Sequence, residues 1–290
     1  MSTIQNLILS GGGVKGLGYG AVLTVLESIG VLDDVHGLAG TSVGALMACL
    51  LAIGYTGPEL RNQMLYEHTY ENLIGEMTPL RLILEPTAFG LNSGELLLSM
   101  IRSKIYAKTG LMKMTFSDLA SRFKKDVKLY ATNLNLGVAV ELSVHTEPDM
   151  EVALAVRASM GLPFIFDPVV YKGDYLVDGG MLNNFPKDAF SHKNSLGFVF
   201  VKQLSEDGIS PAIPSREPIQ NRFQYLTQVM LCTMRNSKTL HPQHDSLAIC
   251  EIEVGDTCSR EFDLSTEQRF QLDWLAFKSV HMWLERLSKK

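Results

Sequence analysis

A serine between two glycines has the setting in this chain that points most directly to chemistry. Gly40-Thr41-Ser42-Val43-Gly44 has the Gly-x-Ser-x-Gly spacing of a nucleophile elbow, in which a strand ends, the chain turns sharply at the serine and a helix begins. The flanking glycines remove Cβ atoms that would collide in so tight a turn. The pattern predicts that the Ser42 hydroxyl stands above a sheet as the nucleophile of an acyl transfer.

A glycine-rich turn upstream supplies a second candidate element, Gly11-Gly12-Gly13-Val14-Lys15-Gly16. Backbone N–H groups at such a turn, with a helix dipole behind them, can stabilise the oxyanion of a tetrahedral intermediate. The residues also fit Gly-x-Gly-x-x-Gly, with Asp33 or Asp34 near the place of a ribose-binding acid, so a dinucleotide site is the rival. Leu17 stands where a phosphate-binding loop needs lysine, which excludes that loop. A nucleotide site has no need of an elbow after the next strand, and this favours the hydrolase.

A third candidate element is Asp178-Gly179-Gly180, which follows a predicted strand. A serine hydroxyl is a weak nucleophile at neutral pH, and a base must accept its proton. Active-site groups of parallel α/β sheets usually project from strand ends, so Asp178 is the candidate base. The two glycines allow the loop to fold close to another backbone. Taken alone, Asp-Gly-Gly is more often a tight turn, and only its combination with the other two motifs favours catalysis.

A histidine base stays open on these residues, because Ser, Asp and His in that order is the usual arrangement of α/β hydrolases. The histidines that follow Asp178 are His192, His241, His244 and His281. None of them sits in a glycine-rich loop after a clean strand. Each is therefore interpreted as a surface or capping histidine.

The elements that must position these residues alternate between strands and helices. The predicted strands are Leu7–Leu9, Leu38–Ala39, Leu129–Thr132, Val138–His145, Tyr175–Val177, Gly197–Val201 and Leu247–Val254. The predicted helices are Tyr19–Ile29, Val43–Ile53, a helix from a capping box at Thr56 to about Tyr70, Val152–Met160, Ile219–Asn236 and Ser265–Ser288. This alternation indicates a parallel sheet covered by helices.

Bulk composition narrows the class of protein. The formal net charge of -5 over 290 residues argues against a nucleic-acid partner. The polar start at Met1 to Asn6 does not resemble a Sec signal, and the longest apolar run, Val43 to Ile53, is too short to span a bilayer. We therefore expect a cytoplasmic or peripheral membrane protein, with export by a non-classical route left open.

The cysteines and the absence of metal-binding motifs point to chemistry without a cofactor. Cys49, Cys232, Cys250 and Cys258 are scattered and are expected to be reduced core thiols. Neither an EF-hand loop nor His-Glu-x-x-His is present, so no metal is expected and activity should persist in chelator.

The order of the three motifs resembles that of the patatin-like phospholipases, of the bacterial type. A further block agrees, since Arg157-Ala158-Ser159 with Pro163 and Phe166 precedes Asp178, and Asn183-Asn184-Phe185-Pro186 follows it. The resemblance implies a three-layer α/β/α fold with a mainly parallel central sheet. It also implies a Ser42–Asp178 dyad without histidine, and an oxyanion hole of amides around Gly12, Gly13 and Val14.

The resemblance divides the chain into a catalytic domain at 5–205, with a helical insertion at about 56–120, and a C-terminal extension at 206–290 packed on the same domain. It implies a serine acyl hydrolase that cleaves carboxyl esters of phospholipids or lysophospholipids at a lipid or membrane surface through an acyl-enzyme. The alternatives are an esterase for neutral lipids or small esters and, more remotely, a NAD-binding protein or a catalytically silent lipid-binding protein. The oligomeric state stays open.

The insertion carries an apolar patch with two interpretations. It could line an acyl channel or touch a bilayer, or it could simply face the core, which is the commoner role of apolar residues at helical spacing. The patch consists of Leu91, Leu96, Leu97, Leu98, Met100 and Ile101.

Overall fold

An eight-stranded sheet organises the part of the chain that the structure describes. This computed structural model describes residues 4–66, 81–85, 88–202, 229, 232, 247–257 and 264–288. The strands are β1 (Asn6–Leu9), β2 (Gly37–Thr41), β3 (Asp126–Asn133), β4 (Val138–Ser143), β5 (Val169–Tyr171), β6 (Asp174–Asp178), β7 (Ser195–Val201) and β8 (Ala248–Glu253). The helices are α1 (Gly18–Ser28), α2 (Val43–Ala52), α3 (Gly57–Tyr66), α5 (Arg81–Leu84), α6 (Glu95–Thr109), α7 (Phe116–Phe123), α8 (Val152–Ser159) and α10 (Thr266–Ser288).

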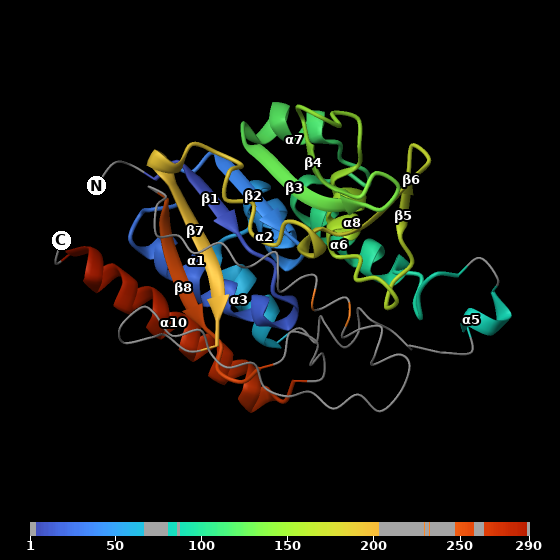
Figure 1. Ribbon diagram of the computed structural model, residues 1–290. Helices are drawn as coiled ribbons and strands as arrows, with labels where there is room; N and C mark the ends of the chain where they lie inside the picture. The colour runs from blue at the N-terminus through green and yellow to red at the C-terminus, as the bar shows by residue number, and fades with distance from the viewer. Residues whose placement is uncertain are drawn as a thin grey trace.

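Parallel strands form most of the sheet, whose order is β5-β6-β3-β2-β1-β7-β8 with β4 paired to β3 (Figure 1). Strand β1 is parallel to β2 and β7, β2 to β3, and β7 to β8. The pairs β3–β4, β3–β6 and β5–β6 are antiparallel. The predicted α/β fold with a mainly parallel sheet is confirmed, as are all of the predicted strands. Strand β5 was missed, because three residues before a Lys-Gly turn carry too little pattern to predict a strand.

The two faces of the sheet pack differently. Alternate residues of a strand point to opposite faces. Leu7 and Leu9 therefore join the large core that the helices form, while Ile8 points to the other face. On that other face the described residues place Ile8 against a small cluster that includes Phe185 and Phe190. The site is thus held between a helical layer and the segment that follows Asp178.

Helices α3, α5, α6 and α7 lie in the stretch interpreted as a helical insertion. The predicted capping box is confirmed, because the Thr56 amide donates to Glu59 Oε2 at 2.9 Å and the Glu59 amide donates to Thr56 Oγ1 at 3.2 Å. Helix α3 is described to Tyr66, and the last residues of its predicted range lie outside the described residues.

The described part of the C-terminal segment contributes strand β8 and the long helix α10. Strand β8 extends the sheet beside β7, and α10 packs on α1 and β8 (Figure 1). Both elements match their predicted ranges closely. The predicted loop at 206–218 lies outside the described residues, and so do His241 and His244. Of the predicted helix at 219–236, only Val229 and Cys232 are described.

Strands β2 and β6 meet end to end along one edge of β3. Residues 128–130 of β3 pair with both β2 and β4, and residues 131–133 pair with both β4 and β6. Because β4 occupies one edge throughout, β2 and β6 must share the other edge. Thr41 lies opposite Tyr130, and Asp178 lies opposite the next residue, Ala131.

This register corrects the reason given for Asp178. We expected it at the carboxyl edge of a parallel strand, but β6 is antiparallel to β3 and points toward β2. Asp178 therefore reaches the end of β2 from the opposite direction. The head-on meeting of the two strands brings Asp178 and Ser42 together.

Candidate active site

Ser42 sits in a strained turn between β2 and α2. Its φ of 54° and ψ of -124° are rarely adopted by residues other than glycine, and such strain is found where the surrounding structure holds a functional group in place. A Cβ on Gly40 would lie 2.3 Å from the Gly44 carbonyl oxygen, and one on Gly44 would lie 2.3 Å from the Leu9 carbonyl oxygen. Both glycines are therefore required by the close approach of backbone at the elbow.

The Ser42 hydroxyl is hydrogen-bonded directly to a buried carboxylate. Ser42 Oγ donates to Asp178 Oδ2 at 2.7 Å, and the Gly180 amide donates to Asp178 Oδ1 at 2.7 Å. Asp178 is fully buried, at 0% exposed, and Ser42 is 7% exposed. A Cβ on Gly179 would lie 2.2 Å from the Tyr130 carbonyl oxygen, so the glycines of the Asp-Gly-Gly loop permit the close packing that aims this carboxylate.

The glycine-rich turn lies against the serine. A Cβ on Gly11 would lie 3.3 Å from Ser42 Cβ, and one on Gly16 would lie 2.2 Å from Val43 Cγ2. The turn leads into a 3-10 helix at Gly13–Leu17. The first amides of such a helix have no acceptor within it, which leaves those of Gly13 and Val14 available to an anion.

Not every amide of this turn is available. The Gly11 amide donates to the Asn184 carbonyl at 2.9 Å, and the Lys15 amide donates to the Gly12 carbonyl at 3.3 Å. Of the oxyanion-hole residues expected at Gly11 to Gly16, the amides of Gly12, Gly13 and Val14 therefore remain the candidate donors to the oxyanion.

Ser159 is a site residue to which sequence reasoning gave no role. The Ser42 amide donates to Ser159 Oγ at 2.8 Å, and Ser159 Oγ donates to the Tyr130 carbonyl at 2.6 Å. Ser159 ends α8 and is fully buried. It thus couples the elbow to β3 and engages the Ser42 amide as a donor. The signal that could have identified Ser159 was its place in the Arg157-Ala158-Ser159 block, which carries part of the family resemblance.

Arg157 joins α8 to the insertion. Its guanidinium donates to the carbonyls of Ser93, Gly94 and Asp167 at 2.8 to 3.1 Å. Burial lowers its pKa to about 10, so it stays protonated at neutral pH. Among the described residues, no hydrogen-bond partner is found for its Nη1. The contacts fix the loop before α6 against the helix that carries Ser159.

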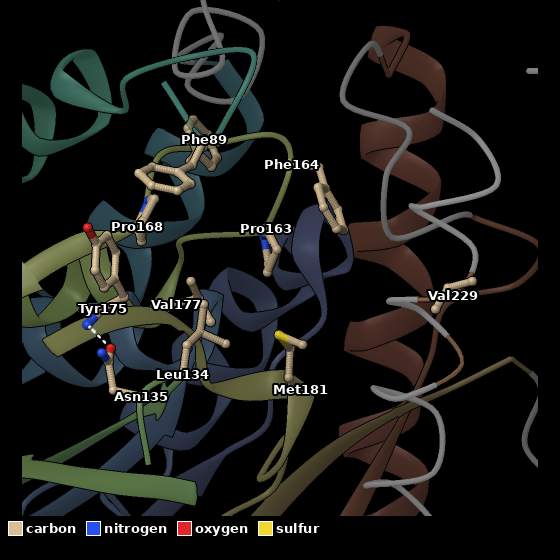
Figure 2. Close-up of a pocket in the computed structure, with 11 residues that line it drawn as sticks. Phe89, Leu134, Asn135, Pro163, Phe164, Pro168, Tyr175, Val177, Met181 and Val229 are labelled. Atoms are coloured by element: carbon tan, nitrogen blue, oxygen red, sulfur yellow. Dashed lines mark hydrogen bonds between the residues drawn. The ribbon is translucent and has the colours of Figure 1, made fainter. Parts of the chain in front are cut away.

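An apolar cavity of about 610 Å³ lies beside the segment that carries Asp178 (Figure 2). Val177 and Met181, which flank the Asp-Gly-Gly loop, line it, and so do Phe89, Leu134, Phe164 and Tyr175. Phe164 has a φ of 67°, a second strained residue at the site. The lining is almost wholly apolar, and Val177 is the direct neighbour of Asp178 in the chain.

The insertion patch does not line this cavity. Leu91, Leu97, Leu98 and Ile101 are buried in the core, Met100 packs partly against it, and Leu96 is exposed. The core interpretation is therefore confirmed for the buried members of the patch, and none of the six residues lines this cavity.

The described histidines bond elsewhere. His192 Nε2 lies 3.3 Å from Asp188 Oδ1, and His281 Nδ1 lies 3.0 Å from the Phe277 carbonyl oxygen. Ser42 Oγ donates to a carboxylate rather than to an imidazole. Asp33 and Asp34 precede β2, so they lie away from the end of that strand, where a ribose-binding acid of a dinucleotide fold would be placed.

The described cysteines are buried in two cases and exposed in one. Cys49 and Cys250 are buried as expected, and burial raises the pKa of each thiol to about 12. Cys232 is exposed, which corrects its assignment to the core, and Cys258 lies outside the described residues. Within these residues, no cluster of three or more potential metal ligands occurs, and no helix is both long and apolar enough to cross a bilayer.

Comparison with known proteins points to one family. The family model described as patatin-like phospholipase matches residues 7–191. An uncharacterised protein of Acanthamoeba polyphaga mimivirus is 29% identical over 99% of this chain and 95% of its own length. A protein of Invertebrate iridescent virus 6 named "Probable lipid hydrolase" is 28% identical over 63% of this chain and 62% of its own length. The crystal structure of VipD from Legionella pneumophila shares the fold, with a TM-score of 0.61 at 16% identity over 98% of this chain and 67% of that one.

Proposed function

Because the chain belongs to the patatin-like phospholipase family and is a lipid-hydrolysing esterase, we propose that it cleaves carboxyl esters of phospholipids or lysophospholipids through Ser42 and Asp178. The observation that carries this proposal is the 2.7 Å hydrogen bond from Ser42 Oγ to Asp178 Oδ2, which joins nucleophile and base without an intervening imidazole. A carboxylate that already accepts the hydroxyl proton is placed to remove it as the ester is attacked.

The reaction proceeds in two acyl transfers. Ser42 Oγ attacks the ester carbonyl carbon as its proton passes to Asp178, and the resulting oxyanion faces the amides of Gly12, Gly13 and Val14. Collapse of this intermediate expels the glycerol oxygen, which takes the proton from Asp178 and leaves an acyl group on Ser42. Water then attacks the acyl-enzyme as its proton passes to Asp178, and Asp178 returns this proton to Ser42 Oγ as the fatty acid leaves.

The apolar cavity beside Asp178 supports a long acyl chain as the substrate group. Its lining is almost wholly hydrocarbon, and Asn135 supplies the polar side chain among the residues named for it. Such a cavity binds methylene groups by removing them from water and offers little to a charged headgroup. The headgroup therefore stays outside, toward solvent or lipid.

Product analysis tests the proposal. The purified chain is incubated separately with phosphatidylcholine, lysophosphatidylcholine, triacylglycerol and a butyrate ester, and released fatty acids are measured by mass spectrometry. We expect release from the two phospholipids to exceed that from triacylglycerol, and Ser42→Ala to release none. Release from triacylglycerol or the butyrate ester alone would contradict the phospholipid assignment.

Narrowing the cavity should change chain-length preference. Leu134 lines the cavity, and Leu134→Trp adds bulk there. We expect kcat/KM for palmitoyl esters to fall about tenfold or more relative to that for butyryl esters, since a few excluded methylenes at about 0.8 kcal/mol each suffice for this change. Leu136 lies two residues on, is exposed and does not line the cavity, so Leu136→Trp is the matched control. Equal chain-length profiles for the two variants would contradict an acyl role for the cavity.

Removing the Ser159 hydroxyl should slow turnover, because it allows the elbow that carries Ser42 to shift. Ser159→Ala leaves the Ser42 amide and the Tyr130 carbonyl without the oxygen that joins them. We expect kcat to fall by about 10- to 100-fold with KM little changed, because small displacements of a nucleophile cost about this much.

Ser195→Ala is the control for the loss of stability alone. Ser195 is also buried and hydrogen-bonds Ser191 and Asn6, away from the elbow. Both variants should lower Tm, and only Ser159→Ala should lower kcat. An unchanged kcat in Ser159→Ala, at a lowered Tm, would show that Ser159 is merely structural.

A further inference from the structure

We propose that a group of exposed apolar side chains, on the cavity lining and beside it, is the surface by which this protein docks on a lipid bilayer. This inference rests on the proposed function, because it assumes that the cavity receives an acyl chain. We call this group the apolar rim: Phe89, Leu134 and Phe164 line the cavity, and Leu136 and Val170 lie beside lining residues in the chain or in the sheet. Their exposed fractions range from 37% to 66%, and a concentration of exposed large apolar residues marks a surface that contacts a partner or a membrane.

Hydrogen bonds and ring contacts hold the rim together around Tyr175. The Leu134 amide donates to the Tyr175 carbonyl at 2.9 Å, and the Tyr175 amide donates to Asn135 Oδ1 at 2.8 Å. The Phe89 ring packs edge-on against the Tyr175 ring, with 5.4 Å between centroids. The turn between β3 and β4 and the loop that carries Phe89 are thus fixed to one strand.

The remaining members extend this surface on either side. Val170 pairs with Tyr175 in the β5–β6 register, and paired residues of adjacent strands point to the same face. Val170 therefore shares the face on which Tyr175 lines the cavity. Figure 2 shows Phe89, Pro168 and Tyr175 on one side of the opening and Phe164 on the other.

Two charged side chains that follow Val170 in the chain, Lys172 and Asp174, have hydrogen-bond partners. Lys172, in the turn after β5, contacts Glu147 at 2.6 Å, and Asp174 accepts a hydrogen bond from Asn133 Nδ2 at 2.7 Å. The rim therefore presents hydrocarbon rather than a charged pattern for a partner to read. A partner that matches it is apolar beneath a hydrated surface, as a bilayer is.

The position of the rim identifies the bilayer as the occupant. An acyl chain must pass from the lipid aggregate into the cavity without crossing water. The rim side chains that line the cavity lie along that path. A protein bound on the rim would cover the cavity mouth and block the chain. Docking by apolar contact also predicts binding to zwitterionic vesicles that is little weakened by salt, in contrast to binding by charge.

Vesicle sedimentation with the full chain tests the inference. The wild type, the double variant Leu136→Glu/Val170→Glu, Ile29→Glu and Ser42→Ala are mixed with phosphatidylcholine vesicles, and hydrolysis of vesicle lipid and of a soluble butyrate ester is measured in parallel. Leu136 and Val170 do not line the cavity. Ile29 is similarly exposed, but it lies between α1 and the start of β2, and so at the end of the parallel strands opposite to Ser42.

We expect the double variant to lower the vesicle partition coefficient and the hydrolysis of vesicle lipid by about tenfold or more, because two charges enter the apolar contact, while its hydrolysis of the soluble ester is unchanged. Ile29→Glu should bind and hydrolyse as the wild type does. Ser42→Ala should bind vesicles normally and hydrolyse neither substrate.

Three results would overturn the docking surface: wild type that stays unbound, equal loss of binding in Ile29→Glu and the double variant, or a dimer in sedimentation equilibrium that the double variant abolishes. The last would assign the rim to a second copy of the chain. Hydrolysis of the soluble ester by Ser42→Ala would instead refute the proposed function, and would leave the vesicle-binding result to be judged separately.

Discussion

Ser42→Ala is expected to lower kcat by roughly 10⁵- to 10⁶-fold, the loss that follows removal of the nucleophile from a serine hydrolase. The substitution removes only Oγ, and with it the atom that must bond to the acyl carbon. Alanine tolerates the backbone at φ 54° about as poorly as serine does, so the strain of the elbow is nearly the same in both proteins. The Tm should therefore change little, and the loss of turnover cannot be attributed to unfolding.

Labelling by a fluorophosphonate probe checks the same prediction without a lipid substrate. The probe phosphonylates an activated serine, so wild type should be labelled and Ser42→Ala should not. Thr41→Ser, which keeps a hydroxyl donor to the Asn183 carbonyl beside the nucleophile, serves as a control and should be labelled as the wild type is. Equal labelling of wild type and Ser42→Ala would refute the nucleophile.

The elbow could be predicted from local sequence because its constraints are local. Gly40 and Gly44 are required by backbone contacts within a few residues of Ser42 and with the neighbouring β1, and the strand and helix on either side have clear apolar patterns. The fold class followed from the same alternation of strands and helices. Sequence reasoning succeeds here because spacing and residue type together define the turn.

The position of Asp178 could be expected from its motif, but not for the right reason. Only the register shows that β6 runs against β3 and meets β2 end to end. Ser159 was beyond local reasoning as well, because its two hydrogen bonds reach residues 117 and 29 positions away. A buried serine at the end of a small-residue helix carries no pattern that predicts such partners.

The cavity could not be located from the sequence for a related reason. The patch at Leu97, Leu98 and Ile101 has apolar residues at helical spacing, and that pattern reports burial without saying against what. The cavity is instead assembled from short segments distant in sequence, such as those of Phe89, Leu134 and Tyr175. Loops that meet only in the folded chain give no periodic signal.

Asp178→Asn is expected to lower kcat by about 10⁴-fold or more, comparable to the effect of removing the aspartate of a catalytic triad. The loss should be at least this large because Asp178 bonds the nucleophile directly, whereas a triad aspartate acts through histidine. Asparagine has nearly the same shape. Its carbonyl oxygen would accept from the Gly180 amide as Oδ1 does now, which turns its NH₂ group toward Ser42 Oγ. A donor then faces the hydroxyl, and no group is left to take its proton.

Asp174→Asn is the matched control, because Asp174 begins the strand that Asp178 ends and bonds Asn133 rather than Ser42. It should keep near wild-type kcat, and so should His192→Ala and His281→Ala, whose imidazoles bond away from the dyad. If Asp178→Asn retained turnover while a folded histidine variant lost it, histidine would be the base and the dyad would be wrong. If Asp178→Asn alone lost turnover at an unchanged Tm, one buried carboxylate would suffice to activate Ser42, as the head-on meeting of β2 and β6 implies.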